Sequence, residues 1–340
     1  MNLRSVSVWF VLPVLTLILF AAPAAQSQRA KAPDRLEIIA RPIVSLHASE
    51  PDRGQFGALE FLGGLELTSA HRGFGGLSGL VMDPDGENFI ALSDRADWVS
   101  GRVRYRDGKP DGIADAWIGP MRGPDGQTLA SRRWFDTEAL TRDGGTLYVG
   151  IERVHQVVRF DYGKDGMLAR GQQIALPADV SKLPSNKGLE CLAFVPQGMP
   201  LADTLIGISE RGLDEKGDIR GFLIGGASPG NFSVKRSDDF DITDCAVTPN
   251  ADLIILERRF TLIRGVAMRM RRVPLSQVAR DSVIDGPVLI LADRSYQIDN
   301  MEGLGVHRDA RGQIVLTLVS DDNFSPLQRT ILLQFTLLDR

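Results

Sequence analysis

Residues 136–153, DTEALTRDGGTLYVGIER, contain one complete unit of a pattern that recurs along the chain. An acidic residue comes before a short apolar stretch, a Gly-Gly turn follows, and an aliphatic strand then ends in an acidic residue and an arginine. Four more segments follow the same scheme, with a polar or acidic first position, a turn that contains Pro, Gly or Asp, and usually the final arginine: GGLSGLVMDPDGENFIALSDR (75–95), NKGLECLAFVPQGMPLADTLIGISER (186–211), DITDCAVTPNADLIILERR (241–259) and DNMEGLGVHRDARGQIVLTLVSDDN (299–323). Repetition at this period predicts a propeller or a similar array of small sheets.

One position near the start of each segment, called the anchor below, sets the period. The anchors are Ser78, Glu138, Glu190, Asp244 and Glu302. They are separated by 60, 52, 54 and 58 residues, which suits one four-stranded blade per repeat. We expect the segments before the first and after the last anchor to form one further blade, because closing the ring with both termini removes exposed sheet edges. The sequence therefore predicts an all-β fold, a six-bladed β-propeller closed by strands from both termini.

Turn residues lie between the expected strands. Asp83-Pro84-Asp85-Gly86 and Arg142-Asp143-Gly144-Gly145 are typical of hairpin turns, in which glycine tolerates positive φ. The chain has 35 glycines in 340 residues, as many tight turns require. Residues 96–133 are rich in Gly, Asp, Arg and Pro, and we expect them to form a long surface loop over one mouth of the ring.

Composition excludes several classes of protein. The formal net charge of −4 provides no basic field for nucleic acid. The two cysteines and four scattered histidines cannot build a cysteine-rich or histidine-rich zinc site. Any bound metal is therefore expected to have oxygen ligands.

The N-terminus predicts export. Residues 1–25 combine a basic residue, an apolar run and small residues near Ala24, which is typical of a signal peptide. The alternative is an uncleaved membrane anchor, because the apolar run is about long enough to span a bilayer. We expect cleavage, a periplasmic or secreted protein, and one propeller domain over residues 26–340 without stable membrane association.

The acidic anchors predict a metal site. Glu138, Glu190, Asp244 and Glu302 occur once per repeat, so equivalent strands would bring them together near the ring axis. Crowded carboxylates repel one another and are costly to desolvate unless a cation compensates. Calcium accepts six to eight oxygen ligands in a flexible shell. The four anchors are therefore predicted to bind Ca²⁺.

A second acidic set ends the repeats, and arginine follows it in four of them. These arginines are Arg95, Arg153, Arg211 and Arg258. Guanidinium groups bind phosphate oxygens in a bidentate manner, and a nearby divalent cation can polarise a phosphoryl group. We therefore predict that the arginines bind substrate. The alternative is that each acid–arginine pair is a salt bridge that holds blades together.

These repeats resemble the phytase-like family, also described as esterase-like activity of phytase. The resemblance rests on SGLVMDPDG with LSDR, DTEALT with IER, KGLECLAF with ISER, DITDCAV with LERR, and NMEGLGV with LVSDDN. It covers nearly all of the chain after residue 25. It implies a secreted or periplasmic propeller with phosphoesterase activity towards phytate or related phosphate esters.

The functional hypothesis is a calcium-dependent phosphoesterase with Glu138, Glu190 and Glu302 as catalytic residues. One alternative is a calcium-dependent lactonase or esterase, and another is a non-catalytic binding propeller with a structural ion. We expect a monomer whose partner is a small-molecule phosphate ester or other ester. Cys191 and Cys245 follow two anchors and are expected to pack between blades as small apolar groups, with a disulfide as the alternative.

Overall fold

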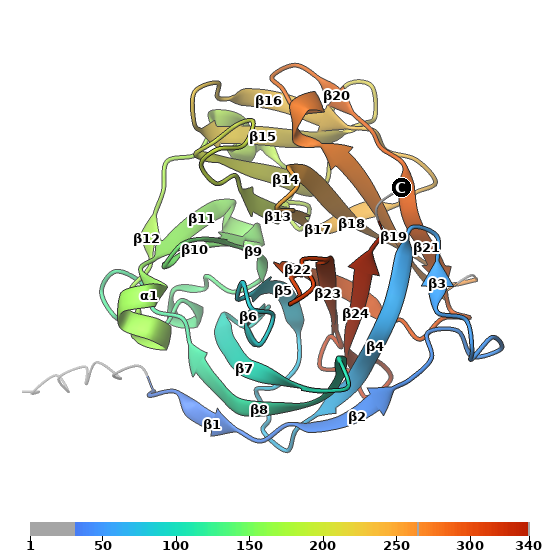
Figure 1. Ribbon diagram of the computed structural model, residues 1–340. Coiled ribbons are helices and arrows are strands. Elements are labelled where there is room, and N and C mark those ends of the chain that lie inside the picture. The colour runs from blue at the N-terminus through green and yellow to red at the C-terminus, as the bar shows by residue number, and fades with distance from the viewer. Residues whose placement is uncertain (1–30, 264, 339–340) are drawn as a thin grey trace, which may run out of the picture.

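The computed structural model describes residues 31–263 and 265–338, which form five β-sheets around a common axis (Figure 1). The fold is an all-β propeller with five blades, so the prediction of six blades was wrong. The predicted signal peptide, residues 1–25, lies outside the described residues. No helix within the described ranges has the length and hydropathy of a membrane span.

The blades are numbered by the order of their innermost strands. Blade 1 contains, from the axis outward, β5 (Leu77–Met82), β6 (Asn88–Ser93), β7 (Asp97–Arg106), β8 (Lys109–Pro120) and β1 (Asp34–Leu36). Blade 2 contains β9 (Thr137–Asp143), β10 (Thr146–Ile151), β11 (Gln156–Phe160) and β12 (Gln172–Gln173). Blade 3 contains β13 (Leu189–Phe194), β14 (Thr204–Leu213), β15 (Ile219–Gly225), β16 (Gly230–Val234) and β20 (Val283–Ile284).

Blades 4 and 5 complete the ring. Blade 4 contains β17 (Asp241–Val247), β18 (Asp252–Thr261), β19 (Gly265–Pro274) and β21 (Val288–Asp293). Blade 5 contains β22 (Asn300–Arg308), β23 (Ile314–Asp321), β24 (Thr330–Leu337), β4 (Leu59–Thr68) and β2 (Ile39–Ile43), with β3 (Gln55–Phe56) paired to β4. The short helices are α1 (Tyr162–Asp165), η1 (Ala130–Arg132), η2 (Glu152–Val154), η3 (Gly166–Leu168), η4 (Ala178–Lys182) and η5 (Leu275–Gln277).

The innermost strands pack in a closed cycle. β5 contacts β9, which is followed by β13, β17 and β22, and β22 contacts β5 again. Five hydrophobic clusters in the described part of the chain each combine side chains of two adjacent blades. One of them joins Ala139 of blade 2 to Leu192 and Phe222 of blade 3. The apolar core is therefore divided into five layers between neighbouring sheets.

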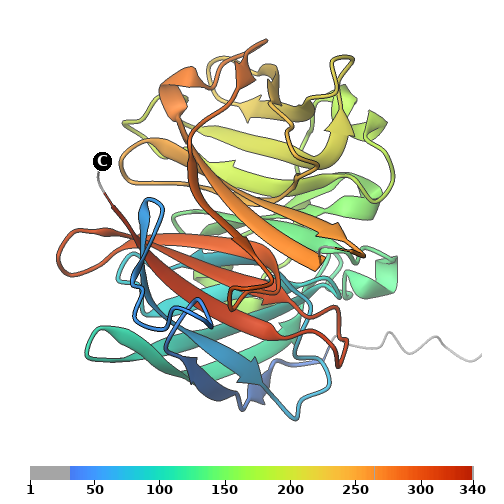
Figure 2. The ribbon, with the colours of Figure 1, turned by 90° about the vertical axis from the view of Figure 1, so that its right-hand side faces the viewer.

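Both ends of the chain complete blade 5 and do not form a sixth blade. After the last anchor, the chain supplies only β22, β23 and β24. β4 from the N-terminal part then pairs with β24, with Leu65 opposite Leu332. Figure 2 shows these blue and red strands side by side. The predicted closure by both termini is confirmed, and the blade count differs because the two terminal segments share one sheet.

Most of the segment predicted to be a surface loop, residues 96–133, forms the strands β7 and β8 of blade 1, and residues 121–133 connect β8 to blade 2. From β7, Trp98 packs between blades 1 and 2, whereas Val99 and Val103 pack between blades 1 and 5. Asp107 and Gly108 join β7 to β8 with φ values of 53° and 75°, which is the two-residue hairpin turn that an Asp-Gly pair favours. The hairpin was predicted to be a loop because its sequence is rich in polar residues, many of which contact solvent on its outer face.

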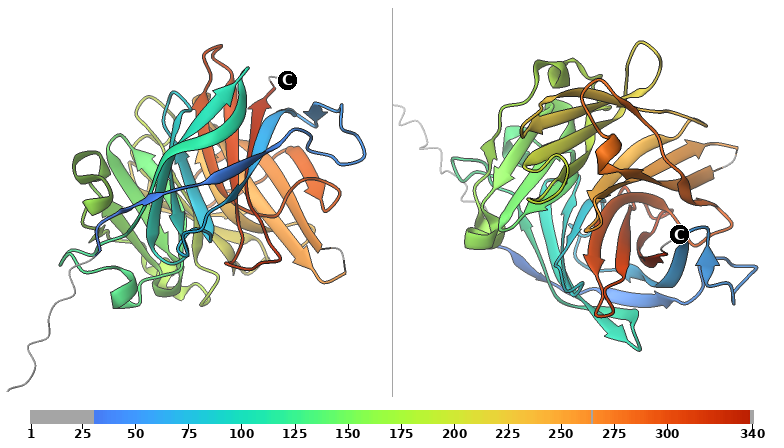
Figure 3. Two further views of the ribbon diagram at one scale, coloured as in Figure 1. Left: turned by 90° about the horizontal axis from the view of Figure 1, so that it is seen from below. Right: turned by 45° about the horizontal axis from the view of Figure 1, so that its top comes forward.

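The N-terminal strands cover outer edges of the ring. β1 pairs with β8 of blade 1, and β2 pairs with β4 of blade 5. Figure 3 shows this dark blue segment along the outside of the two sheets. Covering an unpaired strand edge removes a site at which another chain could pair.

A disulfide joins Cys191 on β13 to Cys245 on β17, with their Cα atoms 5.1 Å apart. The sequence favours packing of the two cysteines as free apolar groups, with a disulfide as the alternative. The structure shows the disulfide. The bond links the innermost strands of blades 3 and 4 directly. A stable disulfide is typical of an oxidising compartment.

Replacing both cysteines with alanine should destabilise the protein. The bond spans 54 residues of sequence, and constraints of this kind contribute about 2–4 kcal/mol. We expect a lower midpoint of urea unfolding and a larger m-value, because the unfolded chain without the bond exposes more surface, and thiol titration of the exported protein should find no free cysteine. Two free thiols, or an unchanged midpoint in the double variant, would contradict this account.

Candidate functional site

Every innermost strand carries a β-bulge at the same level of the ring. The strand pairing skips one residue near the start of each strand. These residues are Ser78, Glu138, Glu190, Thr243 and Glu302. A bulge bends its strand and re-aims the side chain of the extra residue. The repeated bulge thus accounts for the convergence of side chains from different blades.

Asp244, a predicted metal ligand, is one residue past the bulge of blade 4, and Thr243 occupies the equivalent position. The side chain of Asp244 is fully buried. The carboxylate accepts N–H groups of Cys245 and Leu304, each at 2.7 Å. The Leu304 bond connects blade 4 to blade 5, and burial raises the pKa of Asp244. Asp244 is not among the residues that line the acidic cavity described next.

An acidic cavity of about 220 Å³ opens at the bulge end of the axis. It is lined by Asp94, Asp136, Glu138, Glu152, Arg153, Asn186, Lys187, Glu190, Glu210, Arg258, Glu302, Asp321 and Asn323. Eight carboxyl groups thus share the space with three basic groups. Three of the four predicted metal ligands and all three predicted catalytic residues, Glu138, Glu190 and Glu302, lie here together.

The opposite end of the axis has a different character. Its cavity of about 420 Å³ is lined largely by apolar side chains, including Leu140, Phe194 and Val306. Titratable groups are concentrated at the bulge end. The chemistry that the carboxylates can support therefore belongs to that mouth.

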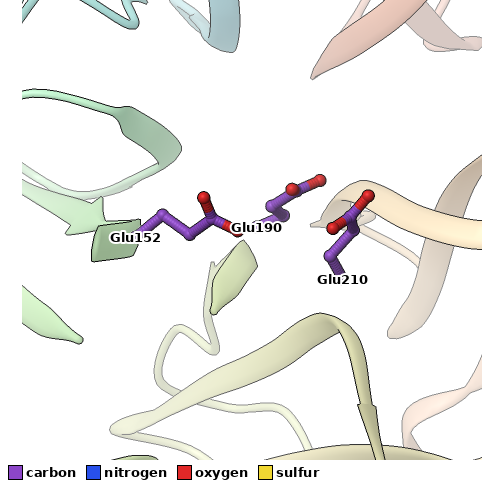
Figure 4. A group of neighbouring side chains, drawn as sticks. All are labelled: Glu152, Glu190 and Glu210. Atoms are coloured by element: carbon purple, nitrogen blue, oxygen red, sulfur yellow. The ribbon is translucent and has the colours of Figure 1, made fainter. Parts of the chain in front are cut away.

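Three carboxylates in the acidic cavity form a compact group. Glu152, Glu190 and Glu210 each have a carboxylate oxygen within 4.8 Å of the others. Figure 4 shows their side chains converging from separate elements. Glu152 begins η2, Glu190 is the bulge residue of β13, and Glu210 lies on β14. All three are buried, and oxygen ligands at this spacing could hold a hard metal ion.

Neighbouring groups hold this triad in place. An oxygen of Glu152 accepts the N–H of Gly188 at 3.0 Å, which joins blade 2 to blade 3. Glu210 accepts a hydrogen bond from the ammonium of Lys187. The Nη2 atom of Arg258 lies 3.5 Å from the other oxygen of Glu210. One side of the triad is therefore partly neutralised.

A second group lies around Glu302. Asn300 donates to the Oε1 atom of Glu302 at 2.8 Å and accepts from Arg258 at 2.7 Å. The Nη1 atom of Arg258 is 3.6 Å from the same glutamate oxygen. Burial and the charge of Glu302 raise the pKa of Asp321 to about 9. Arg258 thus stands between the triad and the Glu302 group.

Burial is the main cause of raised carboxyl pKa values in the cavity. It raises the pKa of Glu152 to about 7 and that of Asp94 to about 6. The pKa values of Glu138 and Glu190 are raised well above the usual range by burial and by neighbouring carboxylates. Without a cation, part of this cluster is protonated near neutral pH. A divalent cation would lower these pKa values and compensate the repulsion.

The four predicted substrate-binding arginines divide into two pairs. Arg153 and Arg258 line the cavity. The Nε atom of Arg153 is 2.6 Å from an oxygen of Asp136. Arg211 instead forms an ion pair with Asp241, at 2.7 Å from Nε, which joins blade 3 to blade 4. Arg95 lies over the ring of Phe324, with its guanidinium carbon 3.3 Å from the ring centroid.

Blade 4 departs from the repeat at its strand end. Glu257 turns away from the cavity and bonds to Arg269 and Arg271, each at 2.7 Å. Arg258, the next residue, takes the place at the cavity wall. Two consecutive side chains of a strand point to opposite faces. This shift explains why one blade contributes a cation where the others contribute an acid.

In the sequence, Glu152 and Glu210 belong to the second acidic set, whose residues come directly before arginines, and this pattern did not assign them to a metal. Lys187 and Asn300 were not identified at all. Their signal is weak because each precedes a conspicuous acidic motif. Only the pairing of adjacent strands shows that strand-end and bulge carboxylates meet in one space.

The sequence profile of the Phytase-like family, described as "Esterase-like activity of phytase", matches residues 72–324. The chain therefore belongs to the phytase-like family, as the five repeats indicated. No curated protein shows significant sequence similarity to it.

Solved structures with a similar arrangement come from varied proteins. An endo-arabinase from Bacteroides thetaiotaomicron VPI-5482 is 12% identical with a TM-score of 0.44, covering 77% of this chain and 94% of that one. The glutaminyl cyclase of Myxococcus xanthus is 11% identical with a TM-score of 0.40, covering 90% and 98%. The WD40 domain of Toxoplasma gondii coronin is 8% identical with a TM-score of 0.34, covering 92% and 89%.

The raised pKa values predict how pH changes the stability of the metal-free protein. The pKa of Glu152 is about 7 when folded against a reference value of 4.5. A carboxyl group whose pKa is higher in the folded than in the unfolded protein makes its full contribution to the free energy of unfolding below the unfolded pKa. This contribution is lost as pH rises through the folded pKa. In chelator, Tm should therefore fall between about pH 4.5 and pH 7.

Glu190→Gln should flatten this fall because it removes one crowded carboxylate, and added divalent cation should restore Tm above pH 7 in the wild type. Glu215→Gln, at an exposed acid that is not among the residues lining the cavity, serves as the control. The Tm of all three proteins is measured by thermal unfolding from pH 4.5 to 8. Parallel curves for wild type and Glu190→Gln would show that the cluster does not control stability.

Proposed function

We propose that the protein is a secreted or periplasmic hydrolase that cleaves a phosphate ester with the aid of a carboxylate-bound calcium ion. The buried group of Glu152, Glu190 and Glu210, in one cavity with Arg258 and Lys187, carries this proposal. Membership of the phytase-like family supports it. The disulfide between Cys191 and Cys245 supports the compartment.

Calcium suits the donors of this cavity. Glu152, Glu190 and Glu210 would be its ligands, since their oxygens already lie within 4.8 Å of one another. Three carboxylates from two adjacent blades favour calcium over magnesium, which prefers fewer protein ligands and a strict octahedron. Of the ligands predicted from sequence, Glu190 is retained in this proposal. Glu138 and Glu302 take other roles, and Asp244 serves the contact between blades.

The other polar residues of the cavity are assigned to substrate binding, proton transfer and orientation in this proposal. A bound divalent cation polarises a phosphoryl oxygen and favours ionisation of water. Arg258, Lys187 and Arg153 would bind the phosphate oxygens and orient the ester. Glu138, which is partly exposed to the cavity, would accept the proton of the attacking water. Glu302 would orient Arg258, because both share hydrogen bonding with Asn300.

Arg95 and Arg211 are assigned to structure in this proposal. The ion pair between Arg211 and Asp241 and the contact of Arg95 with Phe324 leave both outside the cavity lining. The alternative stated for these arginines, contacts that hold blades together, suits this pair. Arg153 and Arg258 remain the proposed substrate-binding arginines.

An uncharged ester or lactone is a second candidate substrate. Each basic group of the cavity already has an acidic neighbour: Asp136 for Arg153, and Glu210 for both Lys187 and Arg258. An anionic phosphate must compete with these carboxylates, whereas a neutral ester need not. The charge of the cavity therefore favours this candidate if the site holds a single cation.

Hydrolysis of phytate, a phosphomonoester, a phosphodiester and a simple lactone by the mature protein distinguishes the candidates. Each substrate is tested with chelator and after calcium is restored. We expect phosphate release that chelator abolishes and calcium recovers. Lactone hydrolysis without phosphate release would favour the second candidate. No turnover with a calcium-dependent rise in Tm would mean that the ion is structural.

A double variant tests the residues. Glu190→Gln with Glu302→Gln should lose calcium binding and at least about 100-fold in activity, since it removes one ligand and the partner of Arg258. Glu215→Gln, the exposed control, should retain both. Full turnover in the double variant at native Tm would contradict the mechanism.

A further inference from the structure

Two blades have a hydroxyl group where the other three have a bulge glutamate. Ser78 is the bulge residue of blade 1 and Thr243 that of blade 4. The Oγ atom of Ser78 donates to the carbonyl of Thr137 at 2.6 Å. The Oγ1 atom of Thr243 donates to the carbonyl of Met301 at 3.0 Å. Each acceptor residue directly precedes a bulge glutamate of the next blade.

We propose that Ser78 and Thr243 are positioning residues for Glu138 and Glu302, an inference that rests on the function proposed above. A carbonyl that precedes a residue shares a peptide plane with the N–H of that residue. Fixing the carbonyl of Thr137 or Met301 therefore fixes the plane from which the following glutamate projects. In both cases, the hydroxyl determines where a neighbouring carboxylate points.

Burial makes these bonds effective. Ser78 and Thr243 are each 1% exposed, so water cannot readily replace the lost donor. Thr137 is held from a second side, since its Oγ1 atom donates to the carbonyl of Ser93 at 2.6 Å. Blade 1 therefore holds the residue before Glu138 through two hydrogen bonds.

The third bulge glutamate is held in another way. Glu190 belongs to the triad with Glu152 and Glu210, and the next residue, Cys191, is fixed by the disulfide to Cys245. The hydroxyl contacts thus serve the two bulge glutamates outside the triad. This division agrees with ligand chemistry at Glu190 and with proton transfer or orientation at Glu138 and Glu302.

The test compares Ser78→Ala and Thr243→Val with Thr243→Ser, which keeps the hydroxyl. Thr317→Val is the matched control, because Thr317 is also fully buried and accepts a side-chain hydrogen bond from Gln334 at 3.1 Å, away from the bulges. Ser78→Ala and Thr243→Val should each lower kcat about 10- to 100-fold, as loss of a positioning partner typically does. The calcium affinity measured by calorimetry should stay within about twofold in both variants, since the triad is unchanged. KM should stay within about twofold in Ser78→Ala and rise in Thr243→Val, because Glu302 orients the substrate-binding Arg258.

Recovery of kcat in Thr243→Ser, with normal turnover in Thr317→Val, would separate positioning from general destabilisation. Unchanged kcat in Ser78→Ala and Thr243→Val would overturn the inference, as would an equal loss in Thr317→Val. If the wild type hydrolyses no ester, the proposed function fails. Hydrogen exchange at residues 137–139 and 301–303 then decides the positioning itself: faster exchange there in Ser78→Ala and Thr243→Val, but not in Thr317→Val, supports it, and unchanged exchange contradicts it.

Discussion

A β-bulge on each of the five innermost strands sets the direction of one side chain per blade at one level of the ring, and three of these side chains line the axial cavity. Without it, the regular alternation of a strand would send these residues into the packing between blades. Three of the five are glutamates, and the strand ends add further carboxylates at the same mouth. The geometry of the backbone thus concentrates charge where solvent is scarce.

Repulsion among these carboxylates destabilises the closed ring. Direct links between the innermost regions of neighbouring blades hold the ring together. These links are Ser78 to Thr137, Glu152 to Gly188, Cys191 to Cys245, Asp244 to Leu304, and Asp322 to Gly76. At least one such link crosses each of the five interfaces. Several use residues within or beside the acidic repeats, so the same motifs provide the charge and the contacts that restrain it.

Repetition in the sequence was sufficient to predict the propeller, its closure by both termini and the meeting of Glu138, Glu190 and Glu302. The blade count was wrong because β4 joins the three C-terminal strands and leaves no material for a sixth sheet. Asp244 lies one residue past the bulge position of blade 4 and outside the cavity lining, an offset that only strand pairing reveals. Glu152 and Glu210 lie in the site because adjacent strands bring them beside Glu190. The spacing of residues within one repeat does not predict these contacts.

The proposed function depends on a divalent cation bound by Glu152, Glu190 and Glu210. Crystals grown with calcium, and with manganese as an anomalous scatterer, would locate this ion. We expect one anomalous peak at the triad, with a carboxylate oxygen of each glutamate about 2.0–2.6 Å from the ion. An empty triad at millimolar cation, or an ion held only elsewhere in the cavity, would contradict it.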